Sequence, residues 1–141
     1  DTGAWVLKKY ETVYPAMVME VIAAVENNTI RRTPQDNSKA TYFSKRTPED
    51  GGINWQWQKE RIQNWVRAQA YPYPGAFCFA GNNKVVIDAV GFSDYGFNDT
   101  DANGTILSML PFVIVKTSNG AIALTSIREG REHLTKGKIL Q

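Results

Sequence analysis

Few side chains in this sequence have the type and spacing that catalysis needs. The single histidine, His133, lies in a charged tail and is expected to be a surface residue. The single cysteine, Cys78, alternates with phenylalanines on a predicted strand, which indicates a packed thiol rather than a nucleophile. The acidic stretch 94–101 lacks the glycine and glutamate positions of an EF-hand, and no ligands have the spacing of a zinc site. The sequence therefore predicts no catalytic or metal-binding residue in this chain.

A basic, turn-rich segment in the middle of the chain is the stronger candidate for a binding site. Its cations and aromatic side chains are Arg31, Arg32, Lys39, Tyr42, Phe43, Lys45, Arg46 and Trp55. A nucleoside diphosphate needs positive charge for its phosphates and a flat surface for its base. We therefore predict that four of these residues bind such a substrate: Tyr42, Lys45, Arg46 and Trp55. The alternative is that the cations are solvated and the aromatic rings cover the open end of the next domain.

Positive charge is concentrated in this segment, although the formal net charge of the whole chain is only +2. Residues 30–71 contain eight Lys and Arg against four Asp and Glu, whereas residues 72–141 contain six of each. A protein that binds duplex nucleic acid or tRNA normally presents a basic surface that displaces counterions from several phosphates. The last part of the chain is not expected to provide one.

Length and composition indicate a single soluble domain. At 141 residues the chain can bury a core without disulfide bonds or metal ions. No apolar run approaches the roughly 18 residues that cross a bilayer, so no membrane partner is expected. A lone cysteine suits a reducing compartment, which predicts a cytoplasmic protein.

The elements that must position these side chains begin with an amphipathic helix within residues 1–28. Its apolar residues recur at the helical period from Val6 to Val25. Pro15 removes a hydrogen bond within this helix, which predicts a kink. A stripe this apolar needs a partner surface, and the polar residues 29–57, interpreted as an ordered linker, offer little that could provide one.

Residues 58–141 are predicted to form a second helix and a small β-barrel. Helical spacing returns between Gln58 and Gln69, and the following YPYPG ends the helix because its prolines cannot continue one. Five short strands with tight turns follow, which is typical of a barrel of the OB type, and the polar tail after them is expected on the barrel surface. The predicted fold class is therefore α+β: a long N-terminal helix, an ordered linker, a second helix and an OB-like antiparallel β-barrel.

Six short motifs stand in a fixed order along the chain: PQD, ATY, RTPEDG, INW, VRA and PYPGAF. Together with VKTSNG and the ending REG…KGKIL, they resemble the 10-formyltetrahydrofolate-dependent formyltransferases, a group that includes methionyl-tRNA formyltransferase and the sugar-nucleotide N-formyltransferases. The resemblance implies a Rossmann-like catalytic domain joined by a linker to an OB-like C-terminal domain. It assigns residues 1–28 to the last helix of the catalytic domain, residues 29–57 to the linker and residues 58–141 to the C-terminal domain.

The resemblance also implies that the chemistry lies outside this chain. Family members use an Asn, a His and an Asp of the N-terminal domain, which also binds 10-formyltetrahydrofolate. The chain alone is therefore expected to bind no cofactor and to be inactive. Asp1-Thr2-Gly3 is similar to the family's catalytic D-x-G, but only one helix separates it from PQD, where the family has a strand and a helix, so we assign Asp1-Thr2 to a helix cap. This sequence departs from the family's pattern at two positions. Asn54 stands where the family commonly has Asp, and Pro15 falls in a helix that the family keeps unbroken.

Of the two acceptors that the resemblance allows, an amino sugar on a nucleoside diphosphate is preferred to tRNA. The residues of the RTPEDG-I-x-W and PYPGAF motifs are closer to those of the sugar-nucleotide N-formyltransferases, here called the sugar branch. The short tail and the balanced charge of the barrel also favour this branch. The alternatives are the tRNA-binding domain of methionyl-tRNA formyltransferase and a non-catalytic dimerisation module. In the sugar branch the C-terminal region often forms the subunit interface, so the apolar helix and the Trp57/Trp65 pair are candidates for a homodimer contact.

Overall fold

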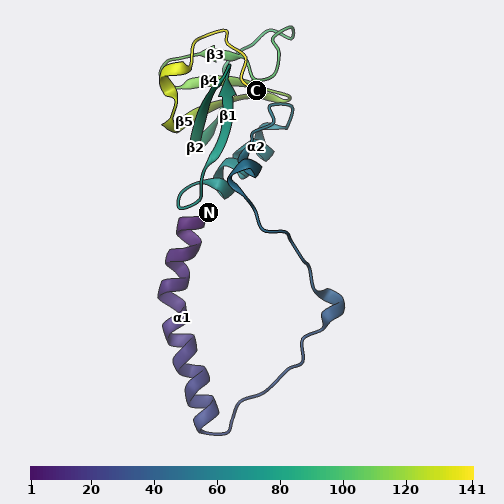
Figure 1. Cartoon of the computed structure of the whole chain (residues 1–141), viewed down its shortest axis with the longest axis vertical. Helices are drawn as coiled ribbons and strands as arrows, with labels where there is room; N and C mark the ends of the chain where they lie inside the picture. The colour runs from purple at the N-terminus through teal and green to yellow at the C-terminus, as the bar shows by residue number, and fades with distance from the viewer. The chain divides into compact units, whose positions relative to one another are not determined.

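The computed structural model describes all 141 residues and divides them into two units. The first consists of Asp1–Ala4 and Thr47–Gln141, and the second of Trp5–Arg46. Figure 1 shows the helices and strands in chain order: α1 (Gly3–Glu26), η1 (Asn37–Lys39), η2 (Pro48–Gly51), α2 (Lys59–Gln69), β1 (Ala76–Ala80), β2 (Asn83–Ser93), β3 (Ile106–Ser108), β4 (Val113–Thr117), β5 (Gly120–Glu129) and η3 (Arg131–His133). Each unit is described separately below.

The unit Trp5–Arg46 contains most of α1 and the extended segment that follows it. The predicted long helix is confirmed, and it runs through Pro15 as one element. None of its residues is buried, and its exposed side chains include tryptophan, tyrosine, methionine and branched aliphatic residues. Two of the rings, Tyr10 and Tyr14, stack on each other with centroids 4.8 Å apart. No helix of the structure is both long and apolar enough to cross a membrane.

The other unit is built on a five-stranded antiparallel sheet with the order β1-β2-β5-β4-β3. This confirms the predicted α+β fold with a small, barrel-like β-domain. The central pair, β2 and β5, shifts register three times between Val86 and Val90. Such bulges bend a strand and increase its twist, so the sheet can curl toward closure.

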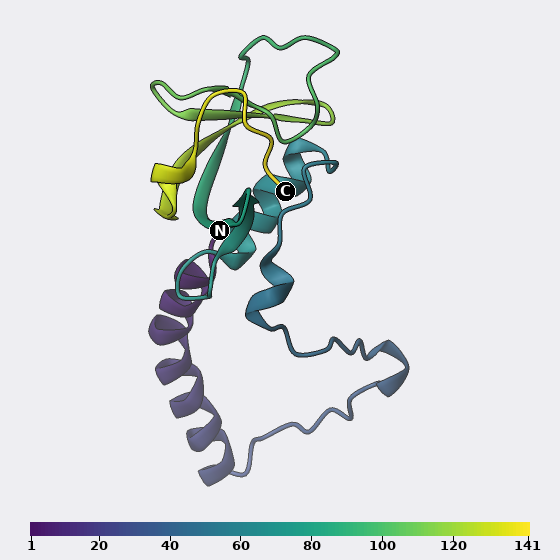
Figure 2. The same ribbon diagram turned by 45° about the horizontal axis from the view of Figure 1, so that its top comes forward.

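The C-terminal tail pairs with both edges of this sheet. On one side the Ile106 N–H of β3 donates to the Lys138 carbonyl, over 2.9 Å, and the Leu140 N–H donates to the Gly104 carbonyl, also over 2.9 Å. On the other side, Phe79 of β1 and Gln141 exchange two backbone hydrogen bonds of 2.7 and 2.9 Å. The tail therefore connects the two edge strands, and Figure 2 shows it in yellow, returning across the sheet. The expectation of a polar tail on the surface was wrong for its apolar residues, because Leu134 and Leu140 are buried.

The core lies between the sheet and helix α2, which packs against β1, β2 and β5. Helix α2 buries Ile62 and Val66, and the tail adds its two leucines. The remaining core residues come from the strands and from the segment before α2: Ile53, Trp55, Ala76, Cys78, Ala80, Val85, Ile87, Ile106, Val113, Val115, Ile122 and Leu124. The unit thus has its own hydrophobic core, held by segments from Ile53 to Leu140.

Candidate functional site

Three of the four predicted substrate-binding residues lie in the extended segment of the unit Trp5–Arg46. Tyr42 is 89% exposed, and Lys45 and Arg46 are also exposed. Upstream of them, Asp36 caps the short helix η1 by accepting hydrogen bonds from the Ser38 N–H and hydroxyl, at 3.0 and 2.6 Å. These bonds lower the pKa of Asp36 from its ordinary value. The PQD motif therefore shapes the segment that carries the exposed Tyr, Lys and Arg.

The fourth predicted residue, Trp55, is a core residue of the other unit and is only 3% exposed. Gly104 lies against its indole, since a Cβ added at Gly104 would come within 3.3 Å of the ring. The indole N–H of Trp55 has no hydrogen-bond partner in the structure. The two neighbouring tryptophans pack edge to face, with the Trp57 and Trp65 ring centroids 5.4 Å apart.

The RTPEDG-INW sequence forms a compact turn that attaches the start of this unit to the sheet. Asp50 accepts a hydrogen bond of 2.7 Å from the Thr47 N–H, which closes the turn around η2. The Trp65 indole of α2 donates to the Gly51 carbonyl over 3.3 Å. The Ile53 N–H then donates to the Phe77 carbonyl of β1 over 2.8 Å. This motif acts as a structural joint between α2 and β1.

The PYPG and REG motifs meet through one arginine. Arg128 of β5 makes a two-pronged ion pair with Asp88 of β2, in which its Nε donates to one carboxylate oxygen over 2.9 Å. A second guanidinium nitrogen donates to the Tyr73 and Pro74 carbonyls over 3.3 and 3.0 Å. The side chain is about a quarter exposed, so it is well placed to hold the proline turn against the sheet.

The VKTSNG turn between β4 and β5 caps helix α2, which lies about sixty residues earlier in the chain. The Lys59 N–H, at the first turn of α2, donates to the Asn119 side-chain carbonyl over 2.8 Å. The Asn119 amide in turn donates to the Glu60 carboxylate over 2.9 Å, and this bond lowers the pKa of Glu60. The side chain of Gln58, which holds the usual capping position, makes no such bond.

The two single titratable residues do not converge on a reactive site. His133 lies at the end of η3, with its Nε2 3.4 Å from a carboxylate oxygen of Glu132. Cys78 is buried among core side chains, and burial raises the pKa of its thiol to about 12. Cys78 is therefore held as a neutral core residue.

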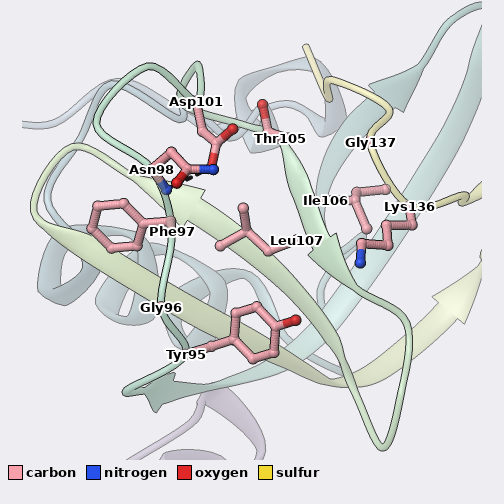
Figure 3. A pocket seen from close by; sticks show the side chains of 10 residues that line it. All are labelled: Tyr95, Gly96, Phe97, Asn98, Asp101, Thr105, Ile106, Leu107, Lys136 and Gly137. Atoms are coloured by element: carbon pink, nitrogen blue, oxygen red, sulfur yellow. Dashed lines mark hydrogen bonds between the residues drawn. The ribbon is translucent and has the colours of Figure 1, made fainter.

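A cavity of about 380 Å³ opens on the barrel beside β3, at a place that the sequence did not indicate (Figure 3). The loop before β3 forms one wall and the tail forms the other, while β3 provides the base. Its lining residues are Tyr95, Gly96, Phe97, Asn98, Asp101, Thr105, Ile106, Leu107, Lys136 and Gly137. No sequence motif joins the two walls, because they lie far apart in the chain and belong to no periodic segment.

Comparison with known proteins agrees with this architecture. Residues 45–140 match the family described as formyl transferase, C-terminal domain. Among solved structures, a variant of HypX from Aquifex aeolicus superposes with a TM-score of 0.59 at 21% sequence identity. The match covers 79% of this chain and 19% of that chain, so this chain spans only a small part of HypX, and the likeness is one of fold. The family match extends over most of the sequence, from the RTPEDG joint to the closing tail, and the chain therefore belongs to the formyl transferase C-terminal domain family.

Proposed function

We propose that this chain is the C-terminal part of an enzyme that transfers a formyl group from 10-formyltetrahydrofolate to the amine of a nucleotide-linked amino sugar. The observation that carries the choice of acceptor is the charge of the unit that contains the barrel. Residues 47–141 contain nine Lys and Arg and nine Asp and Glu. Two of these cations are already engaged, Arg128 by Asp88 and the buried Lys116 by the Asn103 side chain, 3.0 Å away. Without surplus cations, this unit lacks a basic surface that would displace counterions from the phosphates of tRNA.

In this proposal the chain contacts the acceptor and another domain performs the chemistry. The resemblance assigns formyl transfer to an Asn, a His and an Asp, and His133 with its sequence neighbour Glu132 does not reproduce that set. We therefore derive no catalytic step from these residues. When bound to the catalytic domain, 10-formyltetrahydrofolate supplies the formyl group.

The exposed segment before the barrel supplies the proposed acceptor contacts. The Arg46 guanidinium and the Lys45 ammonium are suited to a diphosphate, and the Tyr42 ring to a nucleobase. All three side chains are exposed, as a surface that receives a ligand requires. The contribution of Trp55 is indirect in this proposal, since it is packed in the core close to the RTPEDG joint.

We further propose that the apolar residues of α1 pack on the catalytic domain of the same polypeptide. The family match begins at residue 45, so α1 lies outside the C-terminal family domain. Its exposed apolar side chains exceed what a solvated helix normally carries. A homodimer formed through the same helix is the second proposal for this surface.

We also propose that the enzyme is cytoplasmic, because its one cysteine is a buried free thiol, which suits a reducing compartment.

The test is a formyl-transfer assay on a polypeptide that contains both the catalytic domain and this chain. With 10-formyltetrahydrofolate as donor, we expect formylated product from UDP- or dTDP-linked amino sugars, with binding of the acceptor in roughly the micromolar range. Arg46→Ala and Tyr42→Ala should raise the KM for the acceptor, while Arg131→Ala on η3 serves as a matched surface control. Formylation of methionyl-tRNA, together with tight tRNA binding that weakens steeply with salt, would overturn the choice of acceptor.

A further inference from the structure

The cavity beside β3 is rigidly built on both sides. In the loop, the Asn98 N–H donates to the Asp101 carboxylate over 2.9 Å, and the Asp101 N–H donates to the Asn98 carbonyl over 3.0 Å. In the tail, the Gly137 N–H donates to the Ile106 carbonyl over 2.8 Å. Both walls are therefore fixed before any ligand arrives, which reduces the entropy that binding would cost.

The base of the cavity is apolar, and its rim carries two aromatic rings. Ile106 and Leu107 of β3 are 1% and 8% exposed and form the base. Tyr95 and Phe97 are about two-fifths exposed, so part of each ring is open to a ligand. The Lys116 ammonium lies 4.9 Å from the centre of the Phe97 ring and helps to fix that ring in place. A dry base with aromatic rims suits the C–H face of a ring-shaped ligand.

The polar side chains around this base are those of Lys136, Asp101, Tyr95, Asn98 and Thr105. The Lys136 ammonium has no ion-pair partner, and the Tyr95 hydroxyl has no hydrogen-bond partner in the structure. Asp101 uses one carboxylate oxygen on the Asn98 N–H and keeps the other for a further donor. Figure 3 shows Lys136 and Asp101 on different sides of the hollow, with Leu107 between them.

This arrangement selects among ligand classes. A single lysine suits one anionic group, whereas a polyphosphate would need several cations. The free carboxylate oxygen suits a hydroxyl donor, and a volume of about 380 Å³ lies near the lower limit for small-molecule sites. We propose that this cavity binds a monosaccharide monophosphate, with the phosphate at Lys136, a sugar hydroxyl at Asp101 and the ring against Tyr95. The site is separate from the acceptor contacts proposed above and does not depend on them.

The test uses glucose 6-phosphate as the probe in an NMR titration of the ¹⁵N-labelled 141-residue chain. We expect saturable shifts of backbone amides in residues 95–107 and 136–137, with a dissociation constant of roughly 0.1–1 mM. Lys136→Gln should weaken binding at least about fivefold, because it removes the only charge assigned to the phosphate. Arg131→Gln, which removes an exposed cation outside the cavity, should leave binding unchanged.

Two further ligands separate the parts of the proposal. Glucose and inorganic phosphate, tested alone, should each bind more weakly than glucose 6-phosphate. Tyr95→Leu should weaken the binding of glucose 6-phosphate but not that of inorganic phosphate, since only the sugar contacts the Tyr95 ring. The proposal is overturned by an absence of saturable shifts up to about 10 mM probe, by equal affinity in Lys136→Gln, or by inorganic phosphate binding as tightly as the sugar phosphate.

Discussion

Gly104 shows at the residue scale why one position in the barrel accepts a single residue type. Its φ is +89°, and an added Cβ would lie 2.6 Å from the Leu140 carbonyl oxygen, on backbone that cannot move without opening the tail pairing. We expect Gly104→Ala to lower the free energy of unfolding by about 2–4 kcal/mol, since it combines a strained φ with a backbone clash. Urea unfolding followed by circular dichroism measures this loss.

Gly137→Ala is the matched control for that substitution. Gly137 has a similar φ of +83°, but no atom lies within 4 Å of the added Cβ. It should therefore show only the strain of the left-handed backbone, about 1 kcal/mol. Equal losses in the two variants would show that the contact with the Leu140 carbonyl is unimportant.

Cys78 gives a second prediction at this scale. Because burial raises its pKa to about 12, the thiolate that reacts with disulfide reagents is scarce at pH 8, and the sulfur is also covered. We expect Ellman's reagent to label the native chain only as fast as the domain opens, and to label it rapidly in urea. Immediate labelling without denaturant would contradict the assignment of Cys78 to the core.

At the element scale, helix α2 depends on a residue in a distant turn. Asn119 supplies the capping oxygen to the Lys59 N–H, so Asn119→Ala should cost about 0.5–2 kcal/mol of stability. Asn82→Ala, in the other tight hairpin and without such a contact, should cost less. Chemical denaturation of both variants measures the difference, and equal costs would argue that α2 does not need this cap.

This dependence also explains how much of the fold could be predicted. The helices and the five strands follow from periodicity and turn residues, which are local properties of the sequence. The bond from Lys59 to Asn119 and the bonds from Arg128 to the proline turn join segments that no local pattern connects. For the same reason Trp55 was grouped with exposed neighbours in sequence, although its side chain lies in the core.

At the scale of the whole molecule, the stability of residues 47–141 is expected to be separate from that of residues 1–46. Residues 47–141 contain every strand, α2 and the hydrophobic core, whereas none of the residues of α1 is buried. Deleting residues 1–46 should therefore shift the free energy of unfolding of the remaining unit by less than about 1 kcal/mol. It should also reduce concentration-dependent association in sedimentation velocity runs, because it removes the exposed apolar helix.

A truncated chain that no longer folds would contradict this separation.

The sequence could indicate that α1 needs a partner surface, because a long apolar stripe is visible in its residue spacing. It could not indicate the cavity beside β3, because Tyr95 and Lys136 come together only when the tail pairs with β3. The cavity is defined only once the strands have their neighbours.

The pairing of Gln141 with Phe79 has a consequence for biosynthesis. During translation, β1 to β5 leave the ribosome before the segment that joins their two edges. Until Gln141 has emerged from the exit tunnel, the edges of β1 and β3 keep unpaired backbone groups, which are open to pairing with another nascent chain. A nascent chain that has emerged only as far as Gly130 therefore contains all five strands but lacks the segment that joins their two edges.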